Sequence, residues 1–202
     1  MNKYPIIDWK RFHPHPVIGV DEAGRGCLAG PVFSAAVILT QDEYYPDSKQ
    51  ISPKKRKQLA QNIMNKHIYT IGIADIYEIE KLNILQASLL SMKRALLQLP
   101  MKTGHVLVDG SFLIPELPYS FHQTTFIKGD QRLSPISAAS IIAKVKRDEW
   151  ITKQDKRYPQ YGFSSHKGYA TILHRKAIAQ YGPCPLHRKH FTGVKEYYLK
   201  KQ

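Results

Sequence analysis

Short apolar stretches that alternate with glycine-containing turns predict the β-strands of this chain. VIGVDEA (17–23) and PVFSAAVILT (31–40) follow one another across a glycine-rich turn, a pattern that predicts an antiparallel hairpin. HIYTIGIAD (67–75) is apolar on both alternating faces, HVLVDG (105–110) is a shorter buried run, and HQTTFIKGD (122–130) is a weaker strand. We expect these three later strands to be parallel, because helical segments lie between them and can form crossovers.

Apolar residues at helical spacing predict four helices. The segments are 53–65, 84–99, 134–155 and 169–180. Pro53 and Pro135 suit the first turn of a helix, Pro100 stops the second helix, and Gly182 with Pro183 ends the fourth. Strands and helices in this order indicate an α/β domain with a mixed sheet.

The length of 202 residues suits one domain with a small appendage. We assign residues 1–181 to the domain and residues 182–202, which are basic and rich in proline and histidine, to a C-terminal extension packed on it. No apolar run approaches the roughly 20 residues that cross a bilayer. Cys27 and Cys184 lie far apart, which argues against a zinc site or a disulfide scaffold. We therefore expect a cytoplasmic monomer.

Charge adds a partner to this picture. Thirty Lys and Arg residues stand against 16 Asp and Glu residues, which gives a net charge of +14 and a pI near 9.7. Basic side chains displace condensed counterions from phosphates, so the composition favours a nucleic-acid partner. Charge alone does not distinguish an enzyme that acts on nucleic acid from a non-catalytic nucleic-acid-binding protein.

Acidic residues stand where the apolar runs stop, and these are candidate metal ligands. They are Asp21, Glu22, Asp109 and Asp130. An acid after a strand is often a turn residue or a helix cap. Three such positions in one chain make a site for Mg²⁺ or Mn²⁺ an equal alternative, because clustered carboxylates need cations and these ions prefer oxygen ligands. Alternation sends Asp21 and Glu22 to opposite faces, so we expect the backbone to bend at Glu22.

The glycine–arginine–glycine turn after the first acids is a candidate substrate loop. Gly24 and Gly26 leave main-chain groups uncovered beside Arg25, and such a backbone can sense a ribose 2′-hydroxyl. The bland alternative is a hairpin turn with a surface arginine. Lys167 and Tyr169, in SSHKGYAT, could meet a phosphate and stack on a sugar or base, although most tyrosines are packing residues.

These segments together resemble those of the bacterial ribonuclease HII family, the type 2 ribonucleases H. VDEAGRG, LVDG, KGD, ISAASIIAKVKRD and YGFSSHKGY occur in the family's order, from about Val17 to Val194. The resemblance implies a ribonuclease H-like fold: a mixed five-stranded sheet flanked by helices, with a small C-terminal helical segment. It also implies two-metal cleavage of RNA in RNA–DNA hybrids and at ribonucleotides embedded in duplex DNA, leaving 5′-phosphate and 3′-hydroxyl ends. Another metal-dependent nuclease or phosphotransferase on a similar sheet is the remaining rival.

The resemblance also assigns roles to individual residues. The family's metal-binding acids match Asp21, Glu22, Asp109 and Asp130, its 2′-hydroxyl-sensing loop matches Gly24, Arg25 and Gly26, and its stacking tyrosine matches Tyr169. Its DSK element matches residues 47–49, which makes Lys49 a phosphate contact. Spacing alone does not choose between Asp130 and Asp148 as the fourth acid. The family pattern favours Asp130, and Asp148 can instead pair with Lys144, four residues earlier.

Three positions depart from the family pattern. Cys27 replaces a usual proline, which we expect to loosen the loop slightly. Gln50 and His190 replace a lysine and a serine, and these changes leave the phosphate contacts near them open.

Overall fold

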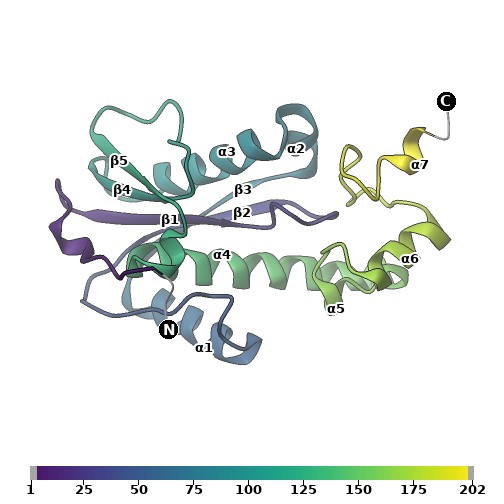
Figure 1. Cartoon of the computed structure of the whole chain (residues 1–202), viewed down its shortest axis with the longest axis horizontal. Helices are drawn as coiled ribbons and strands as arrows, with labels where there is room; N and C mark the ends of the chain where they lie inside the picture. The colour runs from purple at the N-terminus through teal and green to yellow at the C-terminus, as the bar shows by residue number, and fades with distance from the viewer. Residues whose placement is uncertain (1–3, 200–202) are drawn as a thin grey trace.

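A five-stranded mixed sheet forms the centre of the computed structural model, which describes residues 4–199 (Figure 1). The strands are β1 (Val17–Ala23), β2 (Val32–Ile38), β3 (Ile68–Ala74), β4 (Gly104–Asp109) and β5 (Phe121–Phe126). Their order in the sheet is β3-β2-β1-β4-β5. The predicted hairpin is present as the antiparallel pair β1–β2, and β4 and β5 continue the sheet in parallel, as expected.

The prediction that β3 is parallel is wrong, because β3 runs antiparallel to β2. The register pairs Ile38, the last residue of β2, with Ile68, the first residue of β3. Thr40 explains this return, since its backbone N–H and its hydroxyl contact the His67 ring and its hydroxyl also donates to the Lys66 carbonyl. The chain therefore re-enters the sheet at the end where it left, although a helix lies between the two strands.

Helices cover both faces of the sheet (Figure 1). They are α1 (Pro53–Lys66) and α4 (Ser134–Lys153) on one face, and α2 (Ile76–Leu82) and α3 (Ile84–Leu97) on the other. Alternate residues of β2 divide between the two cores, since Ala35 and Val37 pack with Ile141 of α4 and Ala36 packs with Met92 of α3. The short helix α2 was not expected. The three-residue spacing of Asp75 and Glu78, which form the capping box at its start, is a sequence signal that could have predicted it.

The C-terminal segment, residues 154–199, extends beyond the end of α4 (Figure 1). It contains α5 (Phe163–His166), α6 (Ile172–Tyr181) and α7 (Glu196–Leu199). The predicted helix from residue 169 begins at Ile172, because Tyr169 forms a β-bridge with Cys27 and Thr171 caps the helix. Cys184, His187, Arg188 and Val194 of the predicted extension are buried.

The predicted extension therefore contributes to the packing of this C-terminal segment, together with Leu28 and Ile151. Its last three residues, 200–202, lie outside the described part of the chain. No helix within residues 4–199 is long and apolar enough to span a bilayer.

Candidate active site

A notch in the sheet brings the first two acids to one place. Pairing between β1 and β4 ends at Val20, whereas β1 stays paired with β2 as far as Ala23. Asp21 and Glu22 therefore lie on a strand with one open edge, and both line a cavity of about 200 Å³. Asp21 lies beside Ser140 of α4, whereas Glu22 also lines a hollow against α3.

The bend that we expected at Glu22 does not occur. Glu22 pairs with Ser34, and the strand continues regularly through the pair Ala23–Phe33. Alternation does place the two side chains on opposite faces, as a strand requires. Both carboxylates reach the cavity because no neighbouring strand separates the faces at the notch.

The other two acids meet at the ends of β4 and β5. Asp109 is the last residue of β4, and its Oδ1 accepts hydrogen bonds from the amides of Gly129 (2.7 Å) and Asp130 (3.4 Å). Asp130 lies in a 3₁₀ turn, Gly129–Gln131, after the strand rather than on it. Its side chain is buried, and Oδ2 accepts a 2.7 Å hydrogen bond from the Lys49 ammonium. Three separate segments thus bring four carboxyl groups together.

Burial and mutual repulsion disfavour the charged form of these acids. Desolvation, followed by the charges of Asp109 and Glu22, raises the pKa of Asp21 well above its usual range. Desolvation raises the pKa of Glu22 to about 6, although Arg25 opposes the shift. Burial and the charge of Asp130 raise the pKa of Asp109. A cation bound among these acids would favour the charged form that burial and repulsion disfavour.

The chemistry of these donors fits divalent cations. Carboxylate oxygens are the hard ligands that Mg²⁺ and Mn²⁺ prefer. Asp130 Oδ1 is buried without a hydrogen-bond partner among the described residues, which is unusual for a carboxylate unless a cation satisfies it. Within residues 4–199, however, no three His, Cys, Asp or Glu side chains are already arranged to hold a metal ion. Lys49 instead contacts Asp130, so metal binding requires local rearrangement of these side chains.

Two buried arginines, which the sequence analysis missed, hold the glycine–arginine–glycine loop. Arg188 is fully buried, and its guanidinium donates to the carbonyls of Gly24 (2.7 Å), Arg25 (2.8 Å) and Gly30 (2.7 and 3.0 Å). Arg147 is also fully buried and donates to the carbonyls of Ala29 and Lys167. Arg147 also lies 3.5 Å from Asp148 Oδ1. Arginine is rarely fully buried, so nothing in the sequence pattern distinguished these two.

The orientation of the loop follows from these bonds. In a trans peptide the C=O and N–H of one unit point in opposite directions. Since the carbonyls of Gly24 and Arg25 point toward Arg188, the N–H groups of Arg25 and Gly26 point away from it. Cys27 does not loosen the loop as we expected, because its N–H donates to the Gly24 carbonyl at 3.3 Å, a bond that proline could not form.

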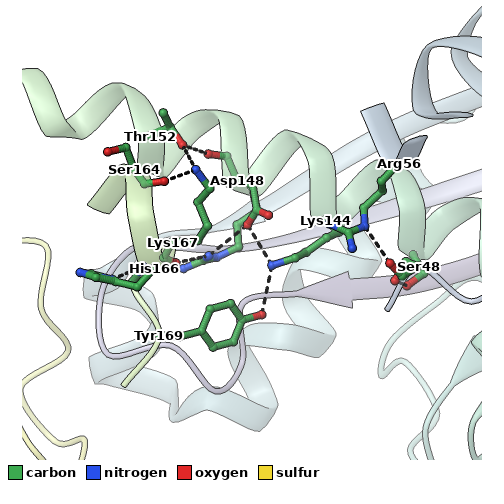
Figure 2. Close-up of polar contacts among 12 residues, drawn as sticks. Ser48, Arg56, Lys144, Asp148, Thr152, Ser164, His166, Lys167 and Tyr169 are labelled. Atoms are coloured by element: carbon green, nitrogen blue, oxygen red, sulfur yellow. Dashed lines mark hydrogen bonds and ion pairs between the residues drawn. The ribbon is translucent and has the colours of Figure 1, made fainter. Parts of the chain in front are cut away.

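Tyr169 and Lys144 complete the cavity wall (Figure 2). Tyr169 is 38% exposed, and the Lys144 ammonium lies 3.3 Å from its hydroxyl and 4.7 Å from its ring centroid. Lys144 also donates to Asp148 at 3.0 Å, so the predicted pairing of these two residues is confirmed. Asp148 lines a different cavity from Asp21, Glu22 and Asp109. The sequence indicated Lys144 as a partner of Asp148 and not as a residue that lines the site.

Lys167 points away from the acids. Its ammonium donates to the Thr152 hydroxyl at 2.8 Å and to the Ser164 carbonyl (Figure 2). With Asp148 and Arg56 it lines the second cavity, of about 480 Å³, which adjoins the acidic one through Arg56. The structure thus brings the acids, the loop, Lys49 and Tyr169 together and places Lys167 next to them.

Acidic residues gathered at a notch in a five-stranded sheet of this order define a nuclease of the ribonuclease H class. The family model for ribonuclease HII matches residues 18–194. Ribonuclease HII of Syntrophotalea carbinolica is 49% identical over 90% of this chain and 87% of its own length. Ribonuclease HII of Coxiella burnetii is 48% identical, covering 89% of this chain and 90% of its own.

A solved structure gives the same result for the fold. The crystal structure of ribonuclease H2 from Pyrococcus horikoshii superposes with a TM-score of 0.75 at 26% identity, covering 91% of this chain and 97% of the archaeal one. The chain therefore belongs to the ribonuclease HII family and is a metal-dependent endoribonuclease. This finding decides against a non-catalytic binding protein and confirms the ribonuclease H-like fold that we expected from the resemblance.

Proposed function

We propose that Asp21, Glu22, Asp109 and Asp130 hold two divalent cations, Mg²⁺ or Mn²⁺, against the substrate backbone at a ribonucleotide. The observation that carries this proposal is the meeting of four carboxyl groups from three segments beside a loop with outward-facing amides. When bound, such ions lower the pKa of an attacking water and stabilise the leaving 3′-oxygen. The products are a 5′-phosphate and a 3′-hydroxyl.

The protein's own groups select the ribose. Arg188 keeps the Arg25 and Gly26 amides facing outward, where they can donate to a 2′-hydroxyl that DNA lacks. Gly24 and Arg25 line the same cavity as the acids, so the ribose is recognised next to the reacting phosphate. Tyr169 supplies a ring face in the same cavity, on which the sugar or base stacks.

Basic residues around the acids position the phosphates. Lys49 is largely exposed beyond its contact with Asp130 and is free to turn to a phosphate when cations neutralise the acids. Lys167, with Arg56, lines the adjoining cavity and would contact phosphates further along the strand. The substrates that this surface fits are RNA–DNA hybrids and duplex DNA with embedded ribonucleotides. Its phosphate contacts make binding weaken as salt rises.

The function is tested with a DNA duplex that contains one ribonucleotide. We expect a single nick at the ribonucleotide only when Mg²⁺ or Mn²⁺ is present, and none after chelation with EDTA. A matched duplex made only of DNA serves as the control and should stay intact. Equal cleavage of both duplexes would show that the 2′-hydroxyl is not recognised. Turnover in EDTA would show that the reaction does not need the cations.

The choice of the fourth acid is tested by a matched pair of variants. Asp130→Asn should reduce kcat by about a hundredfold or more and raise the Mg²⁺ concentration required, because it removes a buried ligand charge. Asp148→Asn should stay within about threefold of wild type, because Asp148 does not line the acidic cavity and its partners are Lys144 and Arg147, of which Arg147 keeps its hydrogen bonds to two carbonyls. The measurement is an Mg²⁺ titration of both variants. A larger loss in Asp148→Asn would reverse the assignment.

A further inference from the structure

Three buried histidines lie behind Tyr169 and take no part in the site described above. His166, His174 and His187 are 8%, 0% and 1% exposed and come from α5, α6 and the C-terminal extension. The rings of His166 and His174 stack with centroids 4.2 Å apart. His174 Nε2 lies 3.0 Å from His187 Nε2. Because buried imidazoles need partners for both ring nitrogens, their hydrogen bonds define their protonation.

The contacts of His174 fix its tautomer. Its Nδ1 lies 2.8 Å from the backbone carbonyl of Tyr169, which can only accept, so Nδ1 carries the proton. In the neutral ring Nε2 is then an acceptor, and His187 must donate to it through Nε2–H. Burial is the main cause that lowers the pKa of both histidines to about 4, which keeps both rings neutral at pH 7.

The contacts of His187 agree with this direction. Its Nδ1, which lacks a proton when Nε2 carries one, accepts the Cys184 N–H at 2.9 Å. The Cys184 carbonyl lies further away, at 3.3 Å from the same nitrogen. A proton on Nδ1 would leave two unprotonated Nε2 atoms of neutral rings facing each other. The hydrogen bonds therefore run one way, from the Cys184 amide through His187 and His174 to the carbonyl of Tyr169.

Tyr169 depends on its backbone for its position. Its N–H donates to the His166 carbonyl at 3.0 Å, and its residue forms the bridge with Cys27 in the substrate loop. Its carbonyl accepts from His174 and from the Thr171 amide. The ring itself is exposed, with Lys144 and Arg147 as its cationic neighbours. What aims the ring at the cavity is therefore the backbone that the histidines hold.

We propose that His174 is a positioning residue for the stacking tyrosine, and that His187 fixes the tautomer in which His174 donates to the Tyr169 carbonyl. This inference rests on the proposed function in one respect, the contact of Tyr169 with the substrate. It adds two residues, remote from the acids, on which recognition of a ribonucleotide in a duplex depends.

A pair of variants at His174 separates donation from packing. The side-chain nitrogen of Asn can replace Nδ1, and that of Gln can replace Nε2, while both variants lose the ring. His174→Asn keeps the donor to Tyr169 and should stay within about threefold of wild-type kcat/KM, whereas His174→Gln loses it and should fall about tenfold, the order that one unmade buried hydrogen bond is worth. The substrate is the duplex with one ribonucleotide, and thermal unfolding shows which variants are folded.

The same pair at His187 should give the opposite order. His187→Gln keeps a donor to His174 Nε2, whereas His187→Asn loses it, so Gln should be the milder change there. A role in packing alone predicts the same order at both positions, because the volumes change in the same way. This second pair also keeps the proposal testable if His174→Gln does not fold.

Tyr169→Ala separates this inference from the proposed function. If Tyr169→Ala retains wild-type kcat/KM, the contact of Tyr169 with substrate is wrong. If it loses activity, the His174→Gln effect should disappear in the Tyr169→Ala background, because both changes then act through one ring. An undiminished His174→Gln effect in that background, or equal losses in His174→Asn and His174→Gln, would overturn the positioning role.

Discussion

Asp21→Asn is expected to reduce kcat by about a thousandfold or more while leaving the affinity for an RNA–DNA hybrid in EDTA unchanged, because charge stabilisation in a closed site acts on this scale. Asp21 is buried at the notch, and the charges of Asp109, Glu22 and Asp130 all act on it. Asparagine keeps its shape and removes the charge that the cations require.

The same change should stabilise the metal-free protein. Since folding raises the pKa of Asp21, its contribution to stability is favourable at low pH and is lost as the pH rises through the folded-state value. At pH 7 the wild-type protein bears the free-energy cost of a buried carboxylate at position 21, and the asparagine variant does not. Its Tm without metal should therefore exceed that of wild type. Adding Mg²⁺ should raise the wild-type Tm and have less effect on the variant, because ligands stabilise only the state that binds them.

Asp148→Asn is the control for both readouts, since it removes one carboxylate outside the acidic cavity. A wild-type rate for Asp21→Asn would contradict the metal assignment. So would an Mg²⁺-induced rise in Tm as large as that of wild type. Hybrid affinity is measured in EDTA, so that a loss of metal binding is not mistaken for a loss of nucleic-acid binding.

Local patterns in the sequence predicted most of the elements. The β1–β2 hairpin follows from two apolar runs around glycines, and the start of α1 at Pro53 follows from Ser52, which caps it through a hydrogen bond to the Lys55 amide. The acids of β1 and β4 stand where their apolar runs end, and this marked them as candidates. Each of these signals is contained within a few neighbouring residues.

What could not be predicted depends on contacts between distant segments. The direction of β3 is set by where the chain re-enters the sheet, which hydrophobic alternation does not encode. A 3₁₀ turn after β5 places Asp130 among the other acids, and only the family resemblance favoured it over Asp148 as the fourth acid. Arg188 lies more than 150 residues from the loop it supports, and an arginine in a basic tail is ordinarily a surface residue.

The buried charge of Arg188 indicates that the loop is held at a cost in stability. Desolvation lowers the pKa of its guanidinium to about 10, and within residues 4–199 it forms no salt bridge to a carboxylate. Four hydrogen bonds to carbonyls compensate for the water it has lost. An apolar residue would fill the space without this cost, but it would not orient the peptides of the loop.

The loop glycines should therefore differ in what alanine does to them. Gly26 is exposed, lies outside the left-handed region, and an added Cβ would meet nothing within 4 Å. Gly26→Ala should fold with unchanged or slightly higher stability, because alanine restricts the unfolded chain. It should nevertheless lower kcat/KM on the single-ribonucleotide duplex by about a hundredfold, because a methyl group on the sugar-reading surface displaces the reacting phosphate.

Gly24→Ala should lose both stability and activity. Gly24 has φ +105°, and its Cβ would lie 2.6 Å from Arg147 Nε. Gly182 has φ +73° with nothing within 4 Å of an added Cβ, and it ends α6 away from the cavity, so Gly182→Ala is the control for backbone strain alone. It should lower the Tm and leave kcat/KM unchanged. A Gly26→Ala enzyme with wild-type kcat/KM would show that the substrate does not approach this backbone, whatever the fate of the other two variants.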